Sequence, residues 1–293
     1  MLLNVLIFFI IGTLFGSLGS VLLIRLSENV NKETIKGILR GRSKCPKCGA
    51  TLKARNLIPI ISFFRQGGKC EQCKQKIPYL YPALELLSGL VFVASFLIFG
   101  NLGIMLVIFR CIVNRLLLLL IVYDVLRYEL HVPLRIILIL VAALPQFFGG
   151  LGNYGWALGS VALFSIFFVG IFFLAKWYIR KKYHQSVEGF GEGDIYLAGA
   201  IGFLVPFIIQ YNQLQFDAPT LINLLLLFVI SSSVLGILFR IIIKIIKHFS
   251  PQAFINTISP LFQDKILIPF IPAMIVAFRI LLWKASFFIG VFF

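Results

Sequence analysis

Long apolar runs alternate with short polar segments along this chain, and eight of the runs stand out. A helix needs about 20 mostly apolar residues to cross the hydrocarbon core of a bilayer, and the runs are close to that length. The pattern therefore predicts an all-α polytopic membrane protein with about eight transmembrane helices. The expected spans are residues 2–24, 82–99, 102–123, 132–148, 154–178, 195–210, 219–243 and 266–282.

Basic residues are distributed unevenly between the loops that join these spans. If the N-terminus lies outside, the loops on the inner side hold 23 of the 27 Lys and Arg residues, and the outer turns hold none. Cytoplasmic loops of membrane proteins carry such an excess, so we expect the N-terminus outside and these loops in the cytoplasm. The basic loops are residues 25–81, 124–135, 176–194 and 240–265.

The composition supports a membrane location. Of 293 residues, 60% are hydrophobic and 13% are charged, whereas a soluble domain carries about 25% charged residues. The net charge of +16 would suggest nucleic acid as the partner of a soluble protein. Here the basic residues are better explained as anchors of cytoplasmic loops. We therefore expect the lipid bilayer, and no nucleic acid, as a partner.

Three segments follow from this pattern. Residues 1–26 are interpreted as a retained transmembrane helix and not as a cleaved signal, because no basic stretch precedes the apolar run. Residues 27–81 form a polar stretch that could fold as a small cytoplasmic domain between the first two helices. Residues 82–293 hold the other seven spans and are expected to form the catalytic domain.

Four of the five cysteines lie in the polar stretch as two Cys-x-x-Cys pairs, Cys45 with Cys48 and Cys70 with Cys73. Two such pairs can place four thiolates around one tetrahedral Zn²⁺ ion. Two disulfides are the alternative, which a cytoplasmic location disfavours. A structural zinc-ribbon-like domain is expected, because four cysteines leave no open position on the metal and so short a segment has little core. Cys111, inside the third span, is expected to be a packing residue.

Asp124 and Asp194 are the acidic residues that the topology brings together. The third span runs inward and ends next to Asp124, whereas the sixth runs outward and begins directly after Asp194. Both should therefore arrive at the cytoplasmic interface. Two neighbouring carboxyl groups cannot both ionise easily, and the resulting acid and base could hydrolyse a peptide bond. The alternative for Asp124 alone is a charge at the interfacial end of a helix.

A glycine-rich segment precedes Asp194. Its three glycines, Gly189, Gly191 and Gly193, would let backbone approach backbone closely. They could therefore admit an extended peptide next to the aspartate. A flexible loop is the simpler interpretation of the glycines when they are considered alone.

Two arginines, Arg110 and Arg115, fall inside the third span, where a charged side chain is costly. They are expected either to pair with Glu85 of the neighbouring span or to line a polar groove. The alternative is that they reach toward the interface, or that the span is wrongly bounded.

Several short motifs follow one another in a characteristic order. They are GSLGSV at 16–21, SKCPKC at 43–48, NLIPIIS at 56–62, GKCEQC at 68–73, YPALELLSG at 81–89, GFGEGD at 189–194 and IPFIP at 268–272. Together they resemble the type IV prepilin peptidases, bifunctional leader peptidase/N-methyltransferases of bacterial pilus, secretion and competence systems. The resemblance extends over most of the chain.

This resemblance implies a function. Asp124 and Asp194 would be the catalytic pair of a membrane aspartyl endopeptidase in the bacterial cytoplasmic (inner) membrane. The enzyme would remove a short basic leader, after a glycine, from type IV prepilins or pseudopilins, and would then methylate the new N-terminus with S-adenosylmethionine. Gly189, Gly191, Gly193 and Glu85 would bind substrate. The four paired cysteines would hold structural zinc.

Some positions depart from the family pattern. Leu134 stands where the family has an acidic residue, Tyr196 replaces a lysine, and Ser20 replaces an asparagine. The retained aspartates favour the peptidase activity. Two other functions remain open at this point: a presenilin-like protease that cuts within the bilayer, and a non-enzymatic transporter or assembly scaffold.

Overall fold

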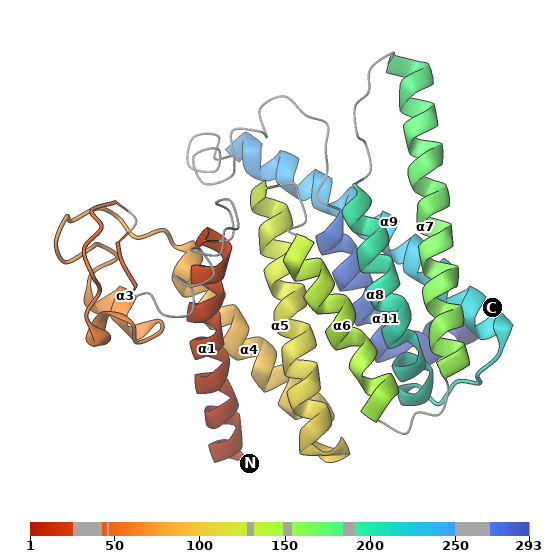
Figure 1. Cartoon of the computed structure of the whole chain (residues 1–293), viewed down its shortest axis with the longest axis horizontal. Helices are drawn as coiled ribbons and strands as arrows, with labels where there is room; N and C mark the ends of the chain where they lie inside the picture. The colour runs from red at the N-terminus through yellow and green to blue at the C-terminus, as the bar shows by residue number, and fades with distance from the viewer. Residues whose placement is uncertain are drawn as a thin grey trace. The chain divides into compact units, whose positions relative to one another are not determined.

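The structure is a computed structural model, and it describes residues 1–25, 43–45, 47–127, 132–148, 154–183, 191–249 and 270–292. Within these ranges the chain is helical apart from turns and two isolated β-bridges (Figure 1). The elements are α1 (Leu2–Arg25), η1 (Ala54–Asn56), α3 (Ile61–Arg65), α4 (Leu80–Phe99), η2 (Gly100–Leu102), α5 (Ile104–Arg127), α6 (Val132–Phe148), α7 (Tyr154–Tyr183), α8 (Glu192–Tyr211), α9 (Ala218–Phe249) and α11 (Ile271–Phe292).

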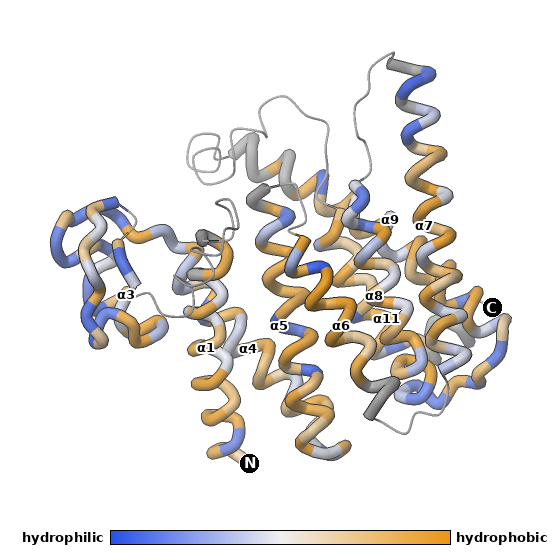
Figure 2. Tube along the Cα trace, viewed as in Figure 1, coloured by the Kyte–Doolittle hydropathy of each residue, from blue (hydrophilic) through white to orange (hydrophobic). Residues whose placement is uncertain are grey.

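The predicted all-α membrane fold is confirmed. Each of the eight apolar runs overlaps one helix, and six described helices (α1, α4, α5, α7, α8 and α9) are long and apolar enough to cross a membrane. The apolar stretch of α6, Val132–Leu144, is shorter. Figure 2 shows these helices as mostly hydrophobic tubes, in contrast to the hydrophilic segment around α3.

The chain forms two compact units, Met1–Leu119 and Leu120–Phe293, whose boundary falls within α5. The first unit contains α1, α4, most of α5 and the tetracysteine module, by which we mean residues 43–45 and 47–78. The second contains the end of α5 and all later helices. The predicted division at residues 26 and 81 stays a prediction.

Small residues let α1 and α4 pack closely in the first unit (Figure 1). A Cβ atom added to Gly12 would lie 2.7 Å from the carbonyl oxygen of Ser88, and one added to Gly16 would lie 2.5 Å from the Cα atom of Glu85. A Cβ on Gly89 of α4 would meet the Phe9 ring at 2.8 Å. Glycines four residues apart on one helix face are typical of close helix contacts in membranes.

A buried arginine joins the three helices of this unit. The guanidinium group of Arg115 donates hydrogen bonds to Ser88 Oγ on α4 at 2.8 Å and to the carbonyl oxygen of Phe15 on α1 at 2.9 Å. The guanidinium of Arg110 lies 4.7 Å from the centre of the Phe99 ring. Buried polar groups require such partners because water cannot replace them in the bilayer. Arg110 and Arg115, whose charges are costly inside a membrane span, therefore hold the helices together.

In the second unit, α8 packs against α6, α7 and α11, and α9 packs against α11. The rings of Phe164 and Phe168 on α7 contact Phe228 on α9, with centroids 5.7 and 5.9 Å apart. Asp217 precedes α9 and accepts the backbone N–H of Thr220 at 2.8 Å. The Thr220 hydroxyl and this N–H both lower the pKa of Asp217, as expected for a helix cap.

The close contact between α1 and α4 can be tested with a pair of glycine variants. Gly16→Leu should lower the free energy of unfolding by about 1–3 kcal/mol, because the new side chain overpacks the α1–α4 contact. Gly159→Leu on α7 is the matched control, since nothing lies within 4 Å of a Cβ atom at that position. Thermal unfolding in detergent measures both variants. Equal stability of the two would contradict the packing described for α1.

Candidate catalytic and metal sites

Two buried aspartates lie in the second unit. Asp124 belongs to the last turn of α5, and Asp194 is the third residue of α8, inside the helix and not just before it. Their side chains are 6% and 5% exposed, respectively. Carboxyl groups are rarely buried this deeply without a functional or structural reason.

The two carboxyl groups are close enough to interact electrostatically. The backbone of Ile271, at the start of α11, hydrogen-bonds the Asp124 carboxyl group, and the backbone of Gly191 hydrogen-bonds that of Asp194. Asp124 Oδ2 is buried without a hydrogen-bond partner in the described part of the chain. The structure thus brings together the two aspartates that the sequence selected, which are 70 residues apart in the chain.

Glycine shapes the backbone beside Asp194. Gly191 is extended, with φ −81° and ψ 142°, and its carbonyl oxygen accepts the N–H of Asp194 at 3.1 Å. A Cβ atom on Gly191 would lie 3.9 Å from Asp194 Oδ2, so glycine leaves space next to the carboxyl group. Gly193 follows in the first turn of α8. Gly189 lies outside the described residues.

Two further glycines position α8, and the sequence analysis missed them. A Cβ atom on Gly202 would lie 2.7 Å from the Cα atom of Val161 on α7, and one on Gly199 would lie 3.1 Å from Ser165 Oγ. These small residues let α8 approach α7 at backbone distance. Their three-residue spacing on one helix was the available signal. They fix the helix whose first turn carries Asp194.

The four paired cysteines form one cluster in the first unit. Their Sγ atoms all lie within 4.8 Å of one another, and those of Cys45 and Cys73 are 3.9 Å apart. Tetrahedral zinc, with Zn–S bonds of about 2.3 Å, requires S···S distances of roughly 3.8 Å. The cluster can therefore hold a metal ion. Cys111 is buried in α5 and is not a member of this group.

The two knuckles of the tetracysteine module have the same backbone pattern. The N–H of Gly49 donates to the carbonyl of Cys45 at 2.9 Å, and the N–H of Lys74 donates to that of Cys70 at 3.1 Å. Both turn residues have positive φ, +69° for Gly49 and +58° for Lys74. Glycine adopts this conformation readily, whereas lysine rarely does.

The thiols ionise unequally. The backbone N–H of Cys48 stabilises the Cys45 thiolate and lowers its pKa to about 7. A hydrogen bond from the backbone at Gln75 also lowers the pKa of Cys73. Burial and the neighbouring thiols outweigh this effect and raise the pKa of Cys73 to about 11. Crowded sulfur atoms cannot all carry negative charge alone. A divalent cation would neutralise that repulsion, which agrees with the geometry.

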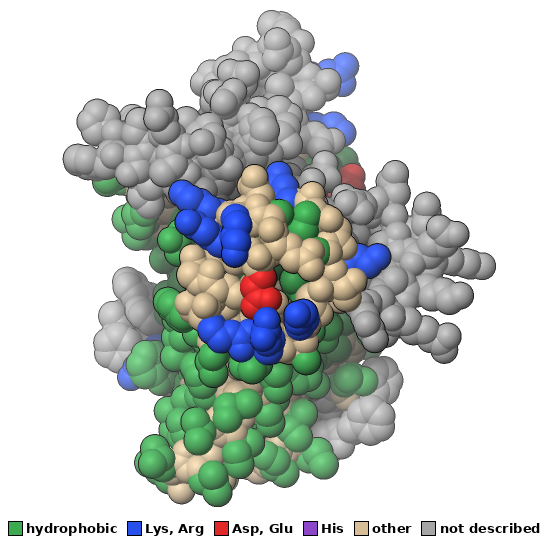
Figure 3. Space-filling view, turned by 90° about the vertical axis from the view of Figure 1, so that its left-hand side faces the viewer, with side chains coloured by type: hydrophobic (Ala, Val, Ile, Leu, Met, Phe, Trp, Pro, Cys, Tyr) green, Lys and Arg blue, Asp and Glu red, His purple; other side chains and the backbone are tan. Residues whose placement is uncertain are grey.

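Other polar contacts hold the tetracysteine module together. Arg55 and Glu71 form an ion pair at 3.3 Å, and hydrogen bonds from Asn56 and Arg55 lower the pKa of Glu71. Figure 3 shows Lys and Arg side chains gathered on this face, with hydrophobic side chains over the helical part beside it. Glu85 belongs to the same unit and accepts the backbone N–H of Ile60 at 2.7 Å. Its assignment as a substrate-binding residue stays a prediction.

Comparison with known proteins finds a match to the family described as the bacterial peptidase A24 N-terminal domain, over residues 10–99. The chain is 32% identical over 208 residues to the prepilin leader peptidase/N-methyltransferase of Bacillus subtilis, which covers 68% of this chain and 73% of that protein. Proteins of the same name match over shorter regions. The one from Myxococcus xanthus is 35% identical over 31% of this chain and 26% of its own length, and the one from Neisseria gonorrhoeae is 42% identical over 19% of each. No solved structure matches the chain significantly.

The metal site predicts a defined stoichiometry. The purified protein should contain about one metal ion per chain, and Cys45→Ser should remove most of it because three thiolates bind less tightly than four. Cys111→Ser is the matched control and should retain the metal, since this cysteine is outside the cluster. Elemental analysis by mass spectrometry measures the content. Metal-free native protein, or equal loss in both variants, would contradict the site.

Proposed function

Because this chain belongs to the prepilin leader peptidase/N-methyltransferase family of bacterial A24 peptidases, we propose that it removes leader peptides from prepilin-like proteins and methylates the new N-terminus. The observation that carries the proposal is the pair of buried, electrostatically interacting carboxyl groups of Asp124 and Asp194. The chain is a multi-pass membrane protein of this bacterial family.

The two carboxyl groups supply the acid and the base of peptide hydrolysis. The ionised carboxylate takes a proton from water, and the water oxygen attacks the carbonyl carbon of the scissile bond. The protonated carboxyl group donates a hydrogen bond to the carbonyl oxygen as charge develops there. When the C–N bond breaks, a proton passes to the leaving amine, which becomes the N-terminus of the mature protein. Asp124 and Asp194 share these roles without a fixed assignment.

The substrate approaches along the backbone beside Asp194. The extended conformation of Gly191 and the space that its missing side chain leaves near Oδ2 suit an extended peptide at the scissile bond. Gly189 and Gly193 are proposed to bind the same extended part of the substrate. Cleavage follows the glycine that ends a short basic leader, and the substrate's apolar helix stays in the bilayer. A presenilin-like protease, the alternative, would instead cut within the bilayer.

Methylation is the second reaction. When bound, S-adenosylmethionine supplies a methyl group to the newly exposed amine, which loses a proton, and S-adenosylhomocysteine is released. Cys45, Cys48, Cys70 and Cys73 would hold Zn²⁺ in a structural role. A tetracysteine site leaves no open position for water on the metal. With a bound ion, the four cysteines would stabilise a module that has little apolar core.

Asparagine variants test the catalytic pair. Asp124→Asn and Asp194→Asn should each lower the rate of prepilin cleavage by at least about 10²–10⁴-fold, because a neutral amide can neither accept nor donate the required proton. Asp217→Asn is the matched control, since Asp217 caps α9 and asparagine caps helices equally well. Cleavage of purified prepilin in detergent measures the rates. Full activity in either of the first two variants would refute the assignment.

The proposed orientation places the tetracysteine module in the cytoplasm and the turn after α4 outside. A membrane-impermeant maleimide should therefore label Asn101→Cys in intact cells. Gln72→Cys, an exposed position on the module, should be labelled only after the membrane is permeabilised. The reverse pattern would show that the orientation is wrong.

A further inference from the structure

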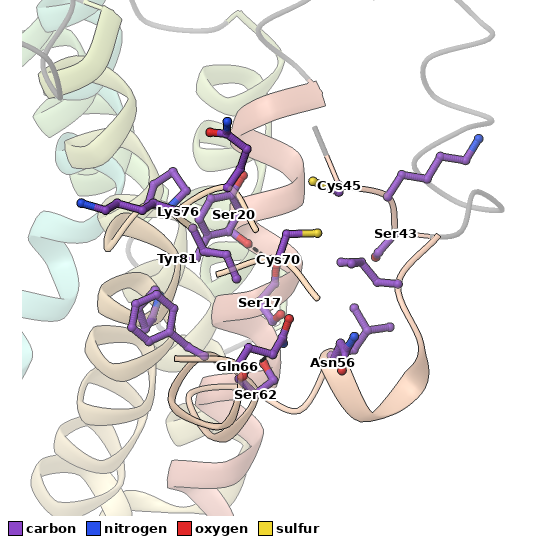
Figure 4. Close-up of a pocket in the computed structure, with 18 of the residues that line it drawn as sticks. Ser17, Ser20, Ser43, Cys45, Asn56, Ser62, Gln66, Cys70, Lys76 and Tyr81 are labelled. Atoms are coloured by element: carbon purple, nitrogen blue, oxygen red, sulfur yellow. Dashed lines mark hydrogen bonds between the residues drawn. The ribbon is translucent and has the colours of Figure 1, made fainter. Parts of the chain in front are cut away.

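A cavity of about 260 Å³ lies in the first unit (Figure 4). The tetracysteine module forms most of its wall, Ser17 and Ser20 of α1 form another side, and the first turns of α4 close it with Tyr81 and Glu85. Its volume approaches the lower end of the range for small-molecule sites, roughly 300–1,000 Å³. No step assigned to the aspartate pair uses this cavity, so its occupant is a separate question.

Glu85 is the acidic residue among those that line the cavity. Its side chain is 8% exposed and is held in place by the backbone N–H of Ile60 at 2.7 Å and by the Ser17 side chain. Ile60 has a φ of +62°, which is rare for a β-branched residue. The carboxylate thus fixes a strained loop and presents negative charge to a partly enclosed space.

Aromatic and apolar side chains supply the rest of a ligand site. Phe63 and Tyr81 line the cavity, and the Phe63 ring contacts the rings of Tyr79 and Phe64, with centroids 5.5 and 5.7 Å away. Phe64, by contrast, points outward and is 72% exposed. Flat aromatic surfaces bind nucleobases by stacking. A mostly apolar wall with a few fixed polar groups is typical of small-ligand sites.

The electrostatics of the cavity favour a ligand that carries both signs of charge. Cys45 and Cys70 of the tetracysteine module line it, and four thiolates around a divalent ion would carry a net charge of about −2. This charge adds to that of Glu85 and attracts a cationic group. The lining lysines, Lys44, Lys47 and Lys76, can bind a carboxylate as point charges.

We propose that this cavity binds S-adenosylmethionine, the methyl donor. Phe63 and Tyr81 would contact the adenine, Glu85 would contact the positively charged sulfonium, and the lysines would bind the carboxylate. The assignment rests on the proposed methyltransferase function and adds to it the site of the second substrate. It makes Glu85 a binding residue for the methyl donor.

Calorimetric titration of S-adenosylmethionine into the metal-loaded full chain tests the assignment. Phe63→Leu should weaken binding by about tenfold, because the stacking surface is lost, whereas Phe64→Leu should bind within about twofold of the native protein because that ring faces outward. Glu85→Gln should also weaken binding by about tenfold. Its amide oxygen can still accept the Ile60 N–H, and Glu71→Gln, outside the cavity, is the control. Metal content verifies that each variant keeps a folded module.

A second ligand tests the charge directly. S-adenosylhomocysteine lacks the sulfonium, so Glu85→Gln should reduce its affinity by a smaller factor than that of S-adenosylmethionine. Equal affinity of all four variants would overturn the proposal. The proposal would also be overturned if the native protein cleaves prepilin but does not bind S-adenosylmethionine. It would be overturned as well if a basic leader peptide binds in place of the donor and its affinity, not that of the donor, falls in Phe63→Leu and Glu85→Gln. Donor binding with the expected pattern, in a protein that neither cleaves nor methylates prepilins, would instead refute the proposed function alone.

Discussion

Repulsion between two carboxyl groups in a buried setting is the constraint on which the second unit depends. Asp124 and Asp194 can be neighbours only if they share a proton or a bound ligand, since two adjacent negative charges are costly where little water screens them. The helix packing maintains that proximity. Gly199 and Gly202 seat α8 against α7 at backbone distance, and Asn212 at its other end donates to the carbonyl of Leu282 on α11 at 3.1 Å.

The first unit is stabilised in a different way, because its polar module is too small to fold around an apolar core. Backbone turns of matching geometry place four thiols together, and a metal ion would then supply the stability that burial does not. Glu85 joins this module to α4 through the Ile60 N–H, while Arg115 joins α4 to α1 and α5. Glu85 and Arg115 therefore connect the parts of this unit, and their buried charges are satisfied by hydroxyl or backbone groups.

Sequence predicted the elements of this fold well because apolar length and the positions of charges are local properties. Topology selected the aspartate pair, because both helix ends were expected on one side of the membrane, and the family resemblance selected the same two residues. The sequence could not predict that α8 begins at Glu192, before Asp194, or that Gly202 contacts Val161, because these depend on which helices pack together. The cavity beside Glu85 was equally hidden, since segments distant in the sequence build it. The turn at Lys74 is local, but a lysine gives no sign of a positive φ angle.

The coupling between the two aspartates provides the most direct test of the central claim. Single-turnover cleavage rates would be compared for Asp124→Asn, Asp194→Asn and the double variant, at enzyme concentrations high enough to measure residual activity. Residues that act as one unit show strongly non-additive losses, so the account predicts that the double variant is about as slow as either single variant. Losses that multiply in the double variant would show that the two carboxyl groups act independently, and would contradict the account.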